Sequence, residues 1–363
     1  MEKGLCELCN PKQWKTVSTS ELTSTGYPVY GANGVIGYYS NYNHEKETLL
    51  ITCRGATCGT LNICNPFSYI NGNAMALDDL SDEIDIKYLY YFLLSRGLSD
   101  TITGSAQPQI VRQSLKNVRV IYPNLDVQKR IIYVLGKADE LLSIREQQLA
   151  KLDELVKARF VEMFGTFPAN PFRWDTGKIQ DVVSDVRYGS SRPAVEGGKY
   201  PYLRMNNITY SGELDLHDTK RIDIPDSELD KCTVRRGDVL FNRTNSKELV
   251  GKTCVYNRDE LMVLAGFVIR VRVNERIRPE ILSAFLNMDF SKRMLIGMCK
   301  TAIGQANINA KELQNIDLYI PPIELQDQFV TLKNKIDQQK QTVQQSLEKL
   351  ELMKKALMQE YFG

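Results

Sequence analysis

The side chains suited to chemistry in this sequence are mainly thiols and the polar residues of short loops. The chain of 363 residues has eight cysteines but only two histidines, so catalysis through imidazole is poorly supplied. Cys6 and Cys9 have the spacing of a zinc-binding pair, but no second CxxC pair follows. We therefore expect reduced, mostly buried thiols and no metal site.

Nucleotide-binding and hydrolase motifs are also missing from the sequence. Gly251-Lys-Thr253 resembles the end of a phosphate-binding loop, but Ser246 stands where that motif requires its first glycine. No GxGxxG, HExxH or GxSxG motif is present, and no pair among the 44 acidic residues is marked out as catalytic. The sequence favours a protein without catalytic activity. A self-sufficient enzyme that binds S-adenosylmethionine or a nucleotide remains an alternative.

Polar residues that can contact DNA bases cluster in loops next to glycines and apolar strands. Arg pairs with guanine O6 and N7, and Asn or Gln pairs with adenine N6 and N7, while hydroxyls and Arg also contact phosphates. The candidate DNA-binding residues of the second half are Ser190, Arg192, Arg204, Asn206, Asn207, Arg243, Thr244, Asn245 and Lys247. Those of the first half are Tyr38, Asn41, Arg54, Thr57 and Gln107.

Composition and charge leave a second interpretation of these loops open. Asn, Ser and Gly favour turns, so ordinary surface loops contain the same residues. The formal net charge of +2 excludes a uniformly basic nucleic-acid-binding coat. Trp14–Thr103 holds five Lys and Arg against nine Asp and Glu. Phosphate affinity in the first half therefore requires a local basic patch, the other half of the chain or a partner.

An internal repeat indicates which elements position the loops. Residues Thr103–Gly165 align with Thr301–Gly363 at a constant offset of 198 residues and without a gap. The chain is therefore a tandem duplication. Upstream of the repeat the two halves differ in length and sequence, which indicates one constant and one variable role.

The constant part of each copy is predicted to be a short strand followed by a long helix. Val118–Tyr122 and Ile316–Ile320 are β-rich and end at prolines. Beyond them, apolar residues recur at spacings of four and three over about five heptads, as in a coiled coil. The basic residues that interrupt the two apolar stripes are Arg145, Arg159, Lys333, Lys340 and Lys354. We expect the helices to pack on each other and to leave polar faces for other chains.

The variable parts are predicted to be β-rich with one short helix each. The strand candidates are Thr48–Cys53, Asp238–Asn242, Lys252–Tyr256 and Phe267–Val273. The helices Ile86–Ser95 and Pro279–Met288 match each other, so the variable parts are diverged copies of one fold. The predicted fold class is α+β. Two β-rich domains, at residues 1–125 and 166–323, alternate with long helices at residues 126–165 and 324–363.

The whole chain resembles the specificity subunit of type I restriction–modification enzymes. The motifs that carry this resemblance are Tyr202–Ile208, Arg236–Phe241 and Leu249–Lys252 in the second half, and Tyr27–Gly34 and Arg54–Gly59 in the first. Each half then has a glutamine-bearing loop, which adds Gln305 to the candidate DNA-binding residues, and Gln128 or Gln326 near the start of a long helix. The first half departs from the common pattern, with Glu47–Ile51 in place of Arg-Gly-Asp-Val-Leu-Phe.

The resemblance implies two target-recognition domains, each binding one half of a bipartite double-stranded DNA sequence, and two antiparallel helices that set the unread spacer. It implies docking of two adenine-N6 methyltransferase subunits and of restriction subunits, with S-adenosylmethionine, ATP and Mg²⁺ on those partners. This chain would then hold no cofactor, metal or catalytic residue.

Two further expectations concern location and an alternative function. No apolar run approaches the roughly 20 residues of a membrane span, and the N-terminus has no apolar leader, so a cytoplasmic location without membrane contact is expected. The alternative function is a duplicated coiled-coil scaffold whose variable parts bind proteins and do not read DNA.

Overall fold

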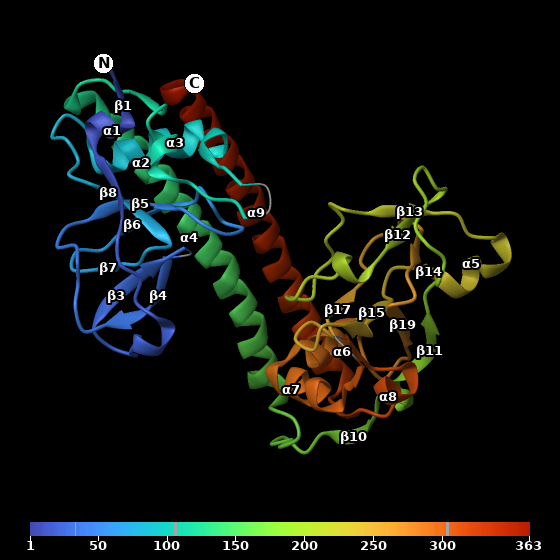
Figure 1. The fold of residues 1–363 in the computed structure, drawn as a ribbon. Coiled ribbons are helices and arrows are strands. Elements are labelled where there is room, and N and C mark those ends of the chain that lie inside the picture. The colour runs from blue at the N-terminus through green and yellow to red at the C-terminus, as the bar shows by residue number, and fades with distance from the viewer. Residues whose placement is uncertain (33, 105–106, 303–304) are drawn as a thin grey trace. The chain divides into compact units, whose positions relative to one another are not determined.

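The chain forms two compact units in the computed structural model, which describes residues 1–32, 34–104, 107–302 and 305–363 (Figure 1). Unit 1 comprises Met1–Glu146 and Gln345–Gly363, and unit 2 comprises Gln147–Gln344. Each unit contains one β-rich domain and parts of both long helices, which confirms the predicted α+β class. Within the described residues, no helix is both long and apolar enough to cross a membrane.

Unit 1 has a four-stranded sheet in the order β2-β8-β5-β6 and a three-stranded sheet in the order β4-β3-β7. Strand β5 is buried along its whole length, as its run of Leu and Ile requires. Strand β1 pairs with β9, directly before the long helix α4. The elements are β1 (Glu2–Gly4), α1 (Leu5–Leu8), β2 (Asn10–Gln13), β3 (Tyr27–Gly31), β4 (Gly34–Tyr39), β5 (Thr48–Thr52), β6 (Leu61–Cys64), β7 (Tyr69–Ile70), β8 (Ala74–Asp78), α2 (Ile86–Arg96), α3 (Arg112–Leu115) and β9 (Arg119–Ile121).

Unit 2 has four-stranded sheets in the orders β11-β19-β15-β17 and β13-β12-β18-β14, and a three-stranded sheet in the order β16-β21-β20. Strand β10 pairs with β22 before the second long helix, as β1 does with β9. The elements are β10 (Asp175–Lys178), β11 (Val183–Tyr188), β12 (Tyr200–Leu203), β13 (Lys220–Ile222), α5 (Asp226–Cys232), β14 (Thr233–Val234), β15 (Val239–Asn242), β16 (Thr244–Asn245), β17 (Thr253–Val255), β18 (Met262–Leu264), β19 (Val268–Val273), α6 (Pro279–Asn287), α7 (Asp289–Met298), β20 (Lys300–Ala302), β21 (Gln305–Asn307), α8 (Ala310–Gln314) and β22 (Asp317–Ile320).

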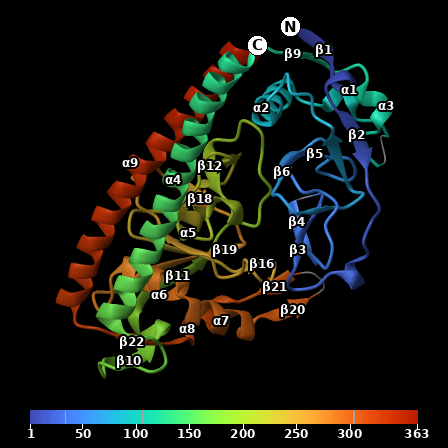
Figure 2. The ribbon, with the colours of Figure 1, turned by 90° about the vertical axis from the view of Figure 1, so that its left-hand side faces the viewer.

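The long helices are α4 (Leu125–Phe164) and α9 (Ile323–Phe362), as their apolar stripes predict (Figure 2). Inside unit 1, Lys354 forms an ion pair with Asp139. Inside unit 2, Lys340 forms an ion pair with Asp153 at 2.5 Å. From the first ion pair to the second, the residue on α4 changes from Asp139 to Asp153, and the residue on α9 changes by the same number of positions in the opposite direction, from Lys354 to Lys340. The helices are therefore antiparallel, with the same register in each unit.

Two of the basic residues that interrupt the apolar stripe of α9 pair with the other long helix. Lys340 and Lys354 each form an ion pair with an aspartate of α4. Lys340 also forms an ion pair with Glu213 of the β-rich domain in unit 2. Opposite charges across a helix pair fix register and orientation. These two lysines therefore hold the helix pair together from within.

A repeated glutamine joins each long helix to its β-rich domain. Gln128 accepts a hydrogen bond from the Asp85 main-chain N at 2.8 Å and donates to the Glu83 and Pro123 carbonyls. Gln326 makes the same contacts in unit 2, with the Arg278 N and the carbonyls of Arg276 and Pro321. Both side chains are fully buried. The start of the long helix is thereby fixed to the start of α2 or α6.

Candidate nucleic-acid interface

Both units pair the same two loops, although the loops are far apart in the sequence. In unit 2, Thr244 and Asn245 of β16 pair with Asn307 and Ala306 of β21. In unit 1, Arg54 bridges to Gln109, and the Gly55 N donates to the Pro108 carbonyl at 3.2 Å. The repeat offset relates Gln109 to Asn307. The loop after β5 therefore lies against the glutamine-bearing loop of unit 1, as the loop after β15 does in unit 2.

Candidate residues of the second half surround one hollow in unit 2, with a volume of about 500 Å³. Its wall comes from four segments, which follow strands β11, β12, β15 and β18. We call this cavity the unit 2 hollow. The predicted residues on its wall are Ser190, Arg192, Arg204, Asn206 and Arg243. A concave surface with convergent Arg and Asn side chains is suited to contacting base edges.

Two of the three arginines on the hollow form exposed ion pairs. Arg192 pairs with Glu228 at 2.6 Å, and Arg204 pairs with Asp218 at 2.8 Å. Hydrogen bonds from these arginines lower the pKa of Glu228 and of Asp218, so both carboxylates are ionised at neutral pH. Exposed ion pairs contribute little stability. A phosphate or a guanine edge can therefore replace either carboxylate as the partner of its arginine.

Arg243 has no carboxylate partner among the described residues. Its guanidinium lies over the Tyr188 ring, 4.9 Å from the ring centre, and donates to the Gly266 carbonyl at a long 3.4 Å. Its Nε is buried without a hydrogen-bond partner. Stacking on an aromatic ring orients a guanidinium without consuming its donors. Arg243 is thus the arginine of the hollow that is best prepared for a bidentate contact.

Three predicted residues of unit 2 have structural roles, and we withdraw them as DNA contacts. Asn207 is 2% exposed, and its amide accepts from the Arg204 N and donates to the Asp215 carbonyl. Ser190 is 4% exposed, and its hydroxyl accepts from the Arg192 N at 3.2 Å. Thr244 is also buried, in β16. Buried polar groups with internal partners are not available to DNA, so these side chains shape the loops.

The remaining predicted residues whose side chains the structure describes lie at the surface of their own unit. In unit 2, Lys247 is exposed, and the Asn245 side chain accepts from the Ser246 N. The Gln305 backbone lies in β21, while its side chain is outside the described part of the structure. In unit 1, the exposed candidates are Tyr38, Asn41, Arg54, Thr57 and Gln107.

An aromatic residue on the hollow was missed by the sequence reasoning. Phe267 is 51% exposed and lies on the wall in the turn between β18 and β19. A solvent-exposed Phe suits contact with a thymine methyl group. In the sequence, Phe267 begins an apolar run, and the pattern predicts that it belongs to the strand Phe267–Val273. Only its place in a turn, directly before β19, distinguishes it from the core residues that follow.

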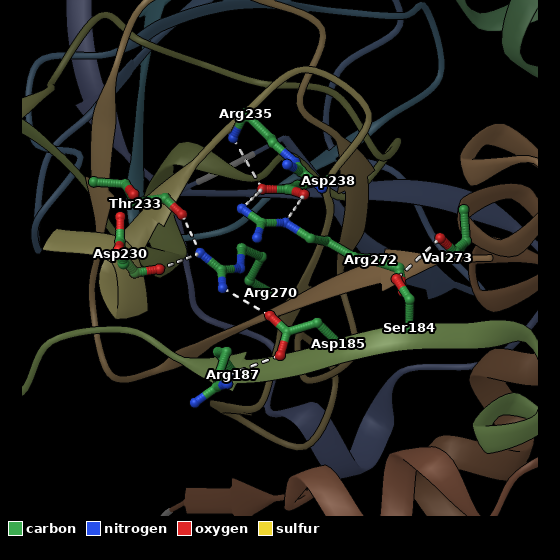
Figure 3. A network of polar contacts seen from close by, with 10 residues as sticks. All are labelled: Ser184, Asp185, Arg187, Asp230, Thr233, Arg235, Asp238, Arg270, Arg272 and Val273. Atoms are coloured by element: carbon green, nitrogen blue, oxygen red, sulfur yellow. Dashed lines mark hydrogen bonds and ion pairs between the residues drawn. The ribbon is translucent and has the colours of Figure 1, made fainter.

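Buried ion pairs hold the strands that carry these loops (Figure 3). Asp238 accepts from Arg272 at 2.8 Å and from the Arg235 N at 2.9 Å, and it is 1% exposed. Arg270 pairs with Asp185 at 2.8 Å. Burial acts to raise the pKa of Asp185, but hydrogen bonds from Arg187 and Arg270 hold it below its ordinary value. The Asp of Arg236-Gly-Asp238 is therefore a structural anchor.

The cysteines show the features of buried thiols. All eight are free, and Cys6 and Cys9 lie on or directly after the short helix α1. The Cys9 thiol donates to the Leu5 carbonyl at 3.2 Å, and burial raises its pKa to about 12. Within the described residues, no group of three or more His, Cys, Asp or Glu side chains is placed to hold a metal ion.

Comparisons with known proteins identify the family of this chain. The family model described as the type I restriction modification DNA specificity domain matches residues 1–154 and 171–352. The chain therefore belongs to this family, and both copies of the duplication carry the domain.

Among curated relatives, the putative type I restriction enzyme MjaX specificity subunit of Methanocaldococcus jannaschii is 26% identical over 53% of this chain and 46% of its own length. The type I restriction enzyme EcoKI specificity subunit of Escherichia coli is 23% identical over 64% of this chain and 53% of its own length. The chain thus spans about half the length of the curated relatives it matches.

Solved structures share the fold over the whole chain. The S subunit of a type I restriction-modification system from M. genitalium is 16% identical, with a TM-score of 0.62, and the match covers 100% of this chain and 96% of that one. A chain from a study of complex assembly and conformational transition of the type I R-M system has a TM-score of 0.56 at 16% identity, covering 100% of this chain and 97% of that one.

Proposed function

We propose that this member of the DNA specificity domain family is the DNA-recognition subunit of a type I restriction–modification complex. The observation that carries the proposal is the unit 2 hollow, whose wall contains Arg204 and Asn206 from one loop and Arg243 from another. Among the described residues, Arg243 has no carboxylate partner and lines the same hollow as the exposed Phe267, an arrangement that a protein scaffold does not need. The same pairing of loops recurs in unit 1, so each unit would read one half of a bipartite sequence.

Recognition would combine base and phosphate contacts. Arg243 supplies a bidentate donor pair for guanine, Asn206 a donor and acceptor for adenine, and Phe267 an apolar contact for a thymine methyl group. Arg192 and Lys247 are exposed and would supply phosphate contacts that fix the orientation of the unit on the duplex. Phosphate contacts release counterions, so binding is expected to weaken as the salt concentration rises.

Catalysis would belong to partner subunits. Two adenine-N6 methyltransferase subunits would dock on the long helices, and restriction subunits would join them. S-adenosylmethionine, ATP and Mg²⁺ would bind to those partners, so this chain would act without a cofactor in the cytoplasm. The long helices would set the length of the unread spacer between the half-sites.

The test is long-read mapping of N6-methyladenine in the native host, with and without this gene. Loss of methylation at a two-part motif with a fixed unread gap is the expected result. The variant Arg243→Ala should relax one base position of one half-site, while Lys231→Ala, at an exposed position of α5 outside the hollow, serves as the control. If the scaffold interpretation is correct, alanine at Arg204, Asn206 and Arg243 leaves every methylated motif unchanged.

A binding measurement on the purified protein tests the alternative that this chain is a self-sufficient enzyme. Calorimetry of the isolated chain with S-adenosylmethionine or ATP should detect no binding. Binding of either compound would favour a self-sufficient enzyme.

A further inference from the structure

Hydrogen bonds from two lysines converge on the segment that closes the 243–250 loop. Lys252 is 7% exposed and donates to the Met205 carbonyl at 2.9 Å. Lys292 of α7 donates to the Gly251 carbonyl at 2.6 Å and to the Asn287 Oδ1 at 2.8 Å. Asn287 donates in turn to the Thr253 carbonyl at 2.6 Å. The base of this loop is thereby tied both to α6 and α7 and to the 204–207 loop.

Lys252 and Lys292 are unusual because their amines are buried without a carboxylate partner among the described residues. No ion pair to either Lys252 or Lys292 is found in the described residues, and their hydrogen-bond partners are neutral carbonyl oxygens. Burial lowers the pKa of both side chains, and that of Lys292 falls to about 7. The free-energy cost of burying each amine offsets much of the gain from its hydrogen bonds. Stability alone therefore does not explain why lysines occupy these positions.

The duplication provides an internal comparison. In unit 2, the Gly251 N donates to the Asn242 carbonyl, and in unit 1 the Gly59 N donates to the Thr52 carbonyl, both at 2.8 Å. Gly59 therefore corresponds to Gly251, and Thr60 stands where unit 2 has Lys252. The sheet forms in unit 1 without a lysine at this position. The hydrogen bond from Lys252 to the Met205 carbonyl is thus specific to unit 2. It connects the 204–207 loop to the end of the 243–250 loop, and both loops carry candidate DNA-binding residues.

We propose that Lys252 and Lys292 are positioning residues that hold the 204–207 and 243–250 loops in fixed register as one DNA-reading surface. This inference rests on the proposed function. Arg204 and Asn206 lie on one loop and Arg243 on the other, so their spacing against neighbouring base pairs depends on the tie between the loops. Base contacts require placement within about 0.5 Å, and independent movement of the loops would blur that spacing.

The experiment measures sequence preference with the chain in its complex with the methyltransferase. Methylated motifs are mapped for wild type, Lys252→Met and Lys292→Met, and Arg243→Ala identifies the half-site that unit 2 reads. Preference at that half-site is expected to fall roughly tenfold, the effect of losing one strong hydrogen bond. The other half-site should stay unchanged. Thermal unfolding of the two lysine variants should stay close to wild type, because the gain from removing a buried amine offsets the cost of leaving its carbonyl partners without a donor.

Control variants make the outcome decisive. Lys231→Met removes an exposed lysine of α5 in the same unit and should leave both half-sites unchanged. Lys252→Arg retains a donor and should restore most of the preference. Unchanged preference in the methionine variants overturns the positioning role, and so does equal loss at both half-sites with lower thermal stability. If wild type itself shows no two-part motif, the proposed function fails, a result distinct from an altered variant beside an intact wild-type motif.

Discussion

Replacing Gln326 with alanine is expected to lower the free energy of unfolding of unit 2 by about 3 kcal/mol. The side chain is 0% exposed. It accepts from the Arg278 N at 2.8 Å and donates to the carbonyls of Arg276 and Pro321 at 3.0 and 2.8 Å. Each hydrogen bond contributes about 1 kcal/mol net, and a buried partner left unsatisfied costs about 1–3 kcal/mol. Three lost contacts therefore set about 3 kcal/mol as the lower end of the effect.

The repeat supplies a matched variant in the other unit. Gln128 makes the equivalent contacts with Asp85, Glu83 and Pro123, at 2.8, 2.9 and 2.9 Å, and is also 0% exposed. Gln128→Ala should therefore destabilise unit 1 by a similar amount. The two glutamines share no partner, so their effects should add in the double variant.

The assay uses the single tryptophan of each unit. Trp14 lies in unit 1 and Trp174 in unit 2, and the chain has no other tryptophan. Urea unfolding followed by fluorescence in a Trp14→Phe background reports on unit 2, and a Trp174→Phe background reports on unit 1. Gln338→Ala, at an exposed position of α9, is the control and should change stability by less than about 0.5 kcal/mol. An effect of Gln326→Ala no larger than that of the control would refute the structural role of the repeated glutamine.

Three further predictions concern unit 2. Asp238→Asn removes the buried charge that pairs with Arg272 and should destabilise unit 2 by about 3 kcal/mol, measured with the Trp174 reporter. Burial, and then repulsion from Lys157 and Lys252, lowers the pKa of Lys292 to about 7. Between pH 7 and the ordinary lysine range the unfolded chain therefore binds a proton that the folded chain does not, so stability should rise with pH across that window. Melting temperatures at pH 7 and pH 9 should show the rise, and Lys292→Met should flatten it. Arg243→Ala should reduce discrimination at one base position by about 1–3 kcal/mol, measured by competition between cognate and single-mismatch DNA, and equal loss on all sequences would indicate a phosphate contact instead.

The frame of the fold was predictable because its signals are local and repeated. A stripe of apolar residues with a period near 3.5 specifies a long helix without knowledge of its partner, and α4 and α9 begin within a residue of the predicted starts. Short apolar runs in the sequence likewise predicted β5, β15, β17 and β19, because such a run is also a local signal. The family suggested by the motifs is confirmed over both halves of the chain.

The details of the candidate interface were not predictable, because they depend on contacts between distant segments. Arg204 and Asn207 lie in one short loop, yet Arg204 lines the hollow while Asn207 is buried against the Asp215 carbonyl. Residue type does not distinguish these outcomes, since Asn serves equally well in a turn and at a base edge. The pairing of β16 with β21 joins residues about 60 positions apart, and neither two- nor three-residue strand has a sequence pattern of its own.

The two copies of the duplication share the glutamine contacts but differ at the position of Lys252, and the atoms that each side chain contacts explain this difference. Gln128 and Gln326 bond only to main-chain atoms, so substitution of a neighbouring side chain does not break these contacts. Lys252, in contrast, has threonine as its counterpart in unit 1, and its bond reaches across to a second loop. Because the glutamines bond to main-chain atoms, the loop sequences can change without loss of these hydrogen bonds. The hydrogen bond of Lys252 joins two loops, so the residue at this position is expected to change when the sequences of those loops change. The two lysines therefore belong with the proposed DNA-reading surface, which varies between the units, and the two glutamines belong with the constant frame.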